Sequence, residues 1–262
     1  KEAVNQLLPE IIQYLHLPQA AEYTLDDLRM ASDSGWVDLD TVPGLHEQIN
    51  RLSKTMVDSS AHWKKTQNTA YYCIDNLLLI FSYLDKKQEY ADFIQQLIPA
   101  EEETDYYIWL ALKVQHKKGY PLSERFVRSL ASRKLFRREV YDLLKDTKEA
   151  RLFPKEYLTQ EAFAEADFVD YCSYYYDEVP EQVKLLLTRP HTIDGKTGII
   201  YLYTCKWYED SKETYLGVSG LYPKKKKLLD RMLDFRHISY DEYDSSMSER
   251  DLEKLLEKWE KE

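Results

Sequence analysis

The sequence predicts a mainly α-helical protein, with antiparallel helix pairs stacked as a solenoid or bundle and a small C-terminal α+β unit containing a β-hairpin. Three observations support this fold class. Apolar residues recur at i, i+3 and i+4 from residue 2 to about residue 188. Only 7 of 262 residues are glycine, against 22 tyrosines, and four of those glycines lie between residues 195 and 220. We therefore expect a helical repeat domain over 1–190 and an appendage over 191–262.

The helices follow from this periodicity and from their capping residues. An apolar stripe from Val4 to Leu15 predicts a first helix that Pro9 either begins or kinks. Thr24, followed by two acids, predicts the N-cap of a short helix to about Met30, and Trp36 lies in a loop. Further helices are expected at 45–57, 61–84, 91–98, 104–117 (capped by Thr104), 123–130 (capped by Ser123), 135–144, 160–174 (capped by Thr159) and 180–187 (begun by Pro180).

The pattern changes after Pro190. Residues 199–208 and 214–221 are rich in β-branched and aromatic side chains and flank a five-residue polar loop, which predicts a β-hairpin. Residues 228–238 fit either a third strand or a short helix. Ser248 then predicts the cap of a charged C-terminal helix.

The stretch LFPKEYLTQEAFAE, which begins at Leu152, and the hairpin that ends YLGVSG at Gly220 carry a family resemblance. Residues 152–220 resemble the C-terminal region of uncharacterised bacterial HEAT-like helical-repeat proteins. The resemblance implies a scaffold of stacked helices with a small β unit, and it supplies no active-site residues.

Composition and motifs argue against several classes of protein. Three widely spaced cysteines without a CxxC pair disfavour a disulfide framework or a zinc site and suit a reducing cytoplasm. The six histidines form no metal-binding pair, and P-loop, GxGxxG and GxSxG motifs are missing. We expect no membrane-spanning helix, no cofactor, no metal and no catalytic residue. Because the first residue is lysine, the chain could also be a fragment of a larger enzyme or regulator.

Charge is strongly segregated along the chain. Residues 113–138 contain nine Lys or Arg and one acid, and residues 156–181 contain eight acids and no base, within a net charge of −10. Such a basic block suits recognition of a partner. The binding candidates are Lys117, Lys118, Arg125, Arg128, Arg133, Lys134, Arg137 and Arg138, together with Tyr174 and Tyr175 from a tyrosine cluster.

These features predict a non-enzymatic scaffold that binds a protein partner with an acidic surface through the basic face of a helical ridge. Three alternatives stay open. The basic and acidic blocks could pair inside the molecule, or the basic face could bind nucleic acid by phosphate contacts, which the net negative charge opposes. An enzyme could also assemble carboxylates such as Glu161 and Glu165 in three dimensions. The tyrosines could form a binding surface or fill the seam between the helices and the hairpin.

Overall fold

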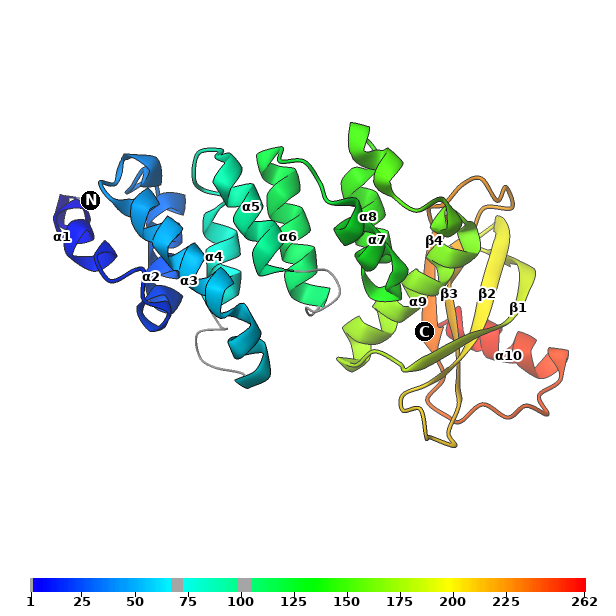
Figure 1. Ribbon diagram of the computed structural model, residues 1–262. Helices are drawn as coiled ribbons and strands as arrows, with labels where there is room; N and C mark the ends of the chain where they lie inside the picture. Colours follow the sequence, from blue (N-terminus) through cyan, green and yellow to red (C-terminus); the bar gives the residue numbers. More distant parts are fainter. Residues whose placement is uncertain (1, 67–72, 99–104) are drawn as a thin grey trace. The chain divides into compact units, whose positions relative to one another are not determined.

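A computed structural model of the protein describes residues 2–66, 73–98 and 105–262 (Figure 1). The chain forms two compact units, Lys1–Val127 and Arg128–Glu262, hereafter unit 1 and unit 2. The border between them lies inside helix α7, Glu124–Ser132. The sequence had suggested a boundary after residue 190, a position that lies within strand β1.

Unit 1 is helical throughout its described part. Each helix contacts the next but one along the chain: α2 packs against α4, α3 against α5, and α4 against α6. Fully buried leucines and isoleucines such as Leu25, Ile49 and Leu77 fill the space between them. The elements are α1 (Glu2–Ile12), α2 (Pro18–Asp33), the 3-10 helix η1 (Leu39–Thr41), α3 (Leu45–Thr66), α4 (Ile74–Ile80), α5 (Gln88–Leu97) and α6 (Asp105–Lys118).

Three expectations for unit 1 need correction or fall outside the description. Thr24 is not an N-cap but lies inside α2, where its hydroxyl donates to the carbonyl of Ala20 at 2.8 Å. Helix α3 continues through residues 58–60, where a break was expected, and α4 ends at Ile80 rather than Leu84. The expected cap at Thr104 lies outside the described residues.

Unit 2 combines helices with a four-stranded antiparallel sheet in the order β1-β2-β3-β4. Each strand pairs with its neighbour in sequence, so the sheet is a meander. The elements after α7 are α8 (Lys134–Leu144), the 3-10 helices η3 (Lys148–Leu152) and η4 (Lys155–Tyr157), α9 (Gln160–Tyr176), β1 (Gln182–Ile193), β2 (Lys196–Lys206), β3 (Tyr215–Tyr222), β4 (Leu233–Ile238) and α10 (Glu249–Trp259).

The hairpin predicted from residues 199–221 is confirmed as β2 and β3, and β4 resolves the ambiguity at 228–238 in favour of a strand. The helix predicted at 180–187 is wrong, because residues 182–193 form β1 and pair along their length with β2. A two-residue turn joins these strands, and both Asp194 and Gly195 have positive φ angles, as a type I′ turn requires. Pairing with β2 therefore prevails over the local helical pattern.

One helix packs on each face of the sheet (Figure 1), whereas the edge strand β1 stays largely exposed. Along β2, Tyr201, Tyr203 and Cys205 pack toward α9, whereas the alternating residues Ile200 and Leu202 belong to the core that α10 covers. This alternation follows from the two-residue period of a strand. It explains why β2 reads as an almost continuous apolar run.

Helix α9 lies very close to β3. A side-chain carbon at Gly217 would overlap the ring of Phe168, which is fully buried and stacks on Tyr203 at 5.2 Å.

The predicted N-caps of α9 and α10, the helices on the two faces of the sheet, are confirmed. Thr159 accepts a hydrogen bond from the Ala162 amide at 3.1 Å, and Ser248 forms a reciprocal capping box with Asp251.

Candidate protein-binding surface

The topology of unit 2 brings three acidic loops to one end of its sheet. Strands β1 and β3 begin at this end and strands β2 and β4 finish there, because the meander is antiparallel. The connecting segments 177–181, 207–214 and 239–248 therefore lie together. They contain nine carboxylates (Asp177, Glu178, Glu181, Glu209, Asp210, Glu213, Asp241, Glu242 and Asp244) and a single lysine, Lys212.

Helix α9 ends at the same place. The C-terminus of a helix carries the negative end of its macrodipole and attracts cations. The residue that follows α9 is Asp177, which closes the helix in the left-handed conformation with φ 54°. Neighbouring carboxylates at a negative helix end repel each other, so a bound cation would relieve this repulsion.

Tyrosine side chains project from the same end. Tyr174 is 82% exposed and Tyr175 is 63% exposed, and their rings meet edge to face with centroids 5.3 Å apart. The ring of Tyr175 also packs on that of the buried Tyr171, with centroids 4.5 Å apart, and this contact holds the Tyr175 side chain in place. Tyr208 and Tyr240, from the other two loops, are exposed as well. We call these four tyrosines and the nine carboxylates the acidic tyrosine surface.

Contacts between the loops give this surface a defined shape. Tyr176 packs on Trp207 with ring centroids 5.1 Å apart. The carboxylate of Glu181 accepts a hydrogen bond from the backbone amide of Glu209. Tyr176 therefore packs against the hairpin, whereas Tyr174 and Tyr175 face solvent.

Two phenols of this region, Tyr208 and Tyr176, have a raised pKa. The hydrogen bond from Tyr208 to Glu178 and the charge of that carboxylate raise the pKa of Tyr208. Burial raises the pKa of Tyr176, and the neighbouring phenol of Tyr240 adds to the shift. Tyr208 and Tyr176 are therefore neutral hydrogen-bond donors with apolar ring faces.

The basic block that the sequence singled out is divided between the two units. Lys117 and Lys118 end helix α6 of unit 1, where the Lys117 ammonium lies 5.1 Å from the ring centre of Tyr83. Arg125 is exposed on the part of α7 that belongs to unit 1. The remaining five candidates, Arg128 and those that follow it, belong to unit 2.

In unit 2 the basic block pairs with the acidic block. Arg128 forms an ion pair with Glu156 at 2.7 Å, and Lys134 forms one with Glu165 at 2.9 Å. Arg133 donates to the hydroxyl of Ser129 at 2.6 Å. These pairs correspond to the intramolecular alternative for the basic block, and they leave less of its charge for an external partner.

Arg137 and Arg138 are structural in this arrangement. Arg137 is only 4% exposed, and it donates to the carbonyls of Ala131 and Ala162 at 2.9 and 3.0 Å. Arg138 binds the buried carboxylate of Asp167 through two hydrogen bonds of 2.9 and 2.7 Å. Asp167 also accepts a hydrogen bond from Tyr222 at 2.6 Å. Burial, reinforced by Asp167, raises the pKa of Tyr222 well above its usual range, so it remains a donor.

The two carboxylates that could belong to an enzyme site, Glu161 and Glu165, have cationic partners. Glu165 pairs with Lys134, and Glu161 pairs with Lys226 at 3.4 Å. Cys172 is buried, and its contact with Cys205, followed by burial, raises the pKa of its thiol. Within residues 2–66, 73–98 and 105–262, no group of three His, Cys, Asp or Glu side chains is placed to hold a metal ion. None of the helices in these ranges is long and apolar enough to cross a membrane.

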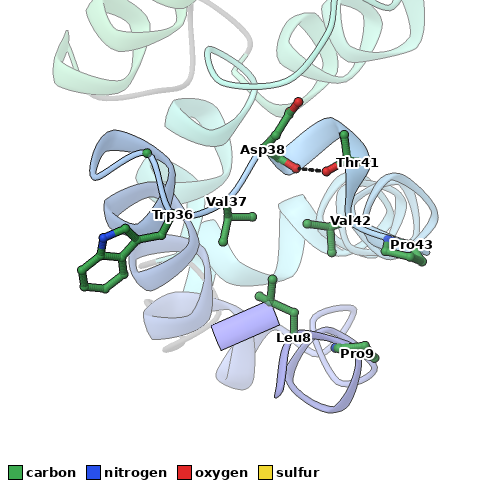
Figure 2. Close-up of a pocket in the computed structure, with 9 residues that line it drawn as sticks. Leu8, Pro9, Trp36, Val37, Asp38, Thr41, Val42 and Pro43 are labelled. Atoms are coloured by element: carbon green, nitrogen blue, oxygen red, sulfur yellow. Dashed lines mark hydrogen bonds between the residues drawn. The ribbon is translucent and has the colours of Figure 1, made fainter. Parts of the chain in front are cut away.

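Unit 1 contains an open pocket of about 570 Å³ between α1 and the loop that carries Trp36. Leu8, Val37 and Val42 lie at its centre, with Trp36 on one side and two prolines on the other (Figure 2). Trp36 is half exposed and lies in a loop, as expected. The hydroxyl of Thr41 donates to the carbonyl of Asp38 at 2.7 Å and closes the loop above (Figure 2).

The loop acids are held by protein donors rather than arranged for a cation. Asp40 accepts the backbone amide of Asp85 at 2.8 Å and pairs with His46 at 2.9 Å. The Asp38 carboxylate accepts the Asp40 amide at 3.2 Å. The Trp36 pocket therefore offers apolar side chains together with the polar groups of Asp38 and Thr41.

Comparison of the chain with protein-family models, with curated proteins and with solved structures finds no match. The HEAT-like resemblance of residues 152–220 therefore stays a prediction.

Proposed function

We propose that the chain is a non-enzymatic protein-interaction module whose acidic tyrosine surface binds a basic segment of a partner protein. The observation that carries the proposal is the coincidence of nine carboxylates with four exposed tyrosines at one end of a rigid sheet. The acidic partner expected from the basic block is less well supported, because Arg128, Lys134, Arg137 and Arg138 already contact carboxylates of unit 2.

Tyrosine suits such a surface for physical reasons. Its ring buries a large apolar area at a small cost in side-chain entropy, and its hydroxyl can still donate a hydrogen bond. The ring face also attracts Lys or Arg, most strongly where carboxylates lie nearby. The carboxylates would speed the encounter with a cationic partner, and the tyrosines would supply the contact area.

The scaffold role extends to unit 1. Contacts between alternate helices are the pattern of a two-layer helical stack, and this supports the HEAT-like solenoid as a proposal for residues 1–127. Three buried free cysteines are compatible with the reducing cytoplasm that we propose as the location.

The test measures binding of a fluorescent decapeptide of alternating arginine and leucine by anisotropy at low and moderate salt. We expect the double substitution Tyr174→Ser/Tyr175→Ser to weaken binding about tenfold, because it removes ring contacts without changing the net charge. Added salt should weaken binding to both forms of the protein.

Tyr23→Ser/Tyr106→Ser is the matched control, since both of these tyrosines are exposed and lie in unit 1. It should bind the peptide as the unsubstituted protein does. Equal losses in the two double variants, or equal binding of a peptide with glutamate in place of arginine, would refute the proposal.

A further inference from the structure

Unit 2 contains a second pocket, of about 510 Å³, at the opposite end of its sheet from the acidic tyrosine surface. Its walls come from α8, from the segment that contains η3 and η4, and from the β3–β4 loop. Six of its nine lining residues are apolar or aromatic (Tyr141, Leu144, Ala150, Phe153, Leu158 and Leu229), and the other three are Lys145, Lys226 and Lys227. A volume of this size is typical of sites for small molecules.

The aromatic floor of the pocket is fixed by packing. Tyr141 and Phe153 meet edge to face with centroids 5.5 Å apart, and both contact Phe163, at 4.9 and 6.1 Å. Phe163 is fully buried, so the floor cannot collapse easily into the space. The ammonium of Lys145 lies 5.8 Å from the ring centre of Tyr141. A ligand would therefore meet an apolar surface with a cation beside it.

Polar side chains of α8 and α9 hold the loop that supplies the other two lysines. The amide of the buried Gln160 donates to the carbonyls of Pro223 and Leu228 at 2.9 and 3.1 Å. Arg138 donates to the carbonyl of Leu229 at 3.1 Å. These three hydrogen bonds anchor the backbone on both sides of Lys224–Lys227, so that Lys226 and Lys227 reach the pocket while Lys224 and Lys225 do not line it.

The charges at the rim favour an anion. The lining residues include three cations and no carboxylate. Lys145 pairs with Asp142 at 2.8 Å, and Lys226 pairs with Glu161 at 3.4 Å across a well-exposed contact. Among the described residues no carboxylate pairs with Lys227. Exposed ion pairs contribute little free energy, so an incoming anion can compete for these ammonium groups.

We propose that this pocket binds a small organic anion with a flat apolar body, such as an aryl carboxylate. The apolar body lies against Tyr141, Phe153 and Leu158, and the anionic group contacts Lys226 and Lys227. The site is separate from the acidic tyrosine surface and does not depend on the function proposed for it.

The test uses 2-naphthoate as the probe and its uncharged amide as the comparison, with binding to the full chain measured by calorimetry. We expect 2-naphthoate to bind with a dissociation constant of about 1 mM or lower. The amide should bind at least about fivefold more weakly, because it cannot form the charge-assisted contacts.

Lys226→Glu/Lys227→Glu should weaken 2-naphthoate binding by at least about fivefold, whereas Lys224→Glu/Lys225→Glu makes the same charge change outside the pocket and should weaken it by less than about twofold. Ala150→Phe should abolish binding of both probes by filling the cavity. Near-ultraviolet circular dichroism identifies the variants that are folded. Equal binding of acid and amide, equal losses in the two lysine double variants, or no binding of 2-naphthoate to the unsubstituted protein would overturn the proposal.

Discussion

Arg128 and Arg138 come from the same basic stretch and differ in their surroundings. Arg128 and its partner Glu156 are both more than half exposed. Arg138 is largely covered, and the Asp167 carboxylate that it binds is 2% exposed. An exposed ion pair is screened by water, whereas a buried carboxylate depends on its partner for charge compensation. The two arginines should therefore differ in what they contribute to stability.

We expect Arg138→Ala to lower the free energy of unfolding of unit 2 by about 3 kcal/mol, since the buried Asp167 then keeps only its longer ion pair with Arg231, at 3.7 Å. Arg128→Ala should leave the urea midpoint almost unchanged. Urea unfolding followed by tryptophan fluorescence would compare the two variants. Similar midpoints for both would contradict the assignment of Arg138 as a structural residue.

For single residues, the sequence indicated which segments are basic and which are acidic. It did not indicate which of the charged side chains are buried. Arg133, Lys134, Arg137 and Arg138 are spaced like a solvated basic face. Burial depends on the packing of α8 against α9, which brings Arg137 and Arg138 beside residues about 25–30 positions further along the chain. Tyr174 and Tyr175 are exposed because they follow the last buried turn of α9, a point on which the sequence left two alternatives open.

Among the elements, α9, α10 and the β2–β3 hairpin were predictable because caps and strand patterns mark them locally. Strand β1 was missed, although Asp194-Gly195 is a strong hairpin signal that points to a strand before it. The three-leucine run at 185–187 read as a short helix after Pro180. Its strand conformation is imposed by pairing with β2, a tertiary contact that helical periodicity does not reveal.

The docking of α10 on the sheet should depend on pH. His237 of β4 stacks on Trp259 of α10 with ring centroids 5.7 Å apart, and burial lowers its pKa, with partial opposition from Glu262 and Asp234. An unfolded histidine titrates near pH 6.5. As the pH falls below that value, His237 becomes protonated in the unfolded chain but stays neutral in the folded chain. The free energy of unfolding therefore decreases.

We therefore expect the melting temperature of the protein to fall between pH 7.5 and pH 5.5, and to fall less in His237→Gln. Thermal unfolding at both pH values measures the difference. Because all other titrating groups are shared, an equal fall in both proteins would exclude a contribution from His237.

On the scale of the molecule, the chain is two units rather than a long repeat domain with a small appendage. Helices α8 and α9 belong to unit 2. So do the sheet and the two hydrophobic clusters that pack on its faces. Composition located the β2–β3 hairpin through its glycines. It did not reveal that the helices at 134–176 belong to the same compact unit, because no local signal separates them from the helices before them.

A polypeptide of residues 120–262, which includes the whole of α7, should therefore fold by itself. We expect one cooperative thermal transition and a near-ultraviolet circular dichroism signal from Trp207 and Trp259. A broad transition without that signal would show that unit 2 needs residues 1–119.

The meander also has an electrical consequence. Four consecutive lysines occupy the turn at one end of the sheet, and nine carboxylates occupy the loops at the other, roughly one strand length apart. The loop charges of unit 2 are therefore separated along the sheet, with lysines at one end and carboxylates at the other. The electric field of these charges would orient unit 2 relative to an approaching cationic molecule before the two touch. The tyrosines at the acidic end would then make the first contact.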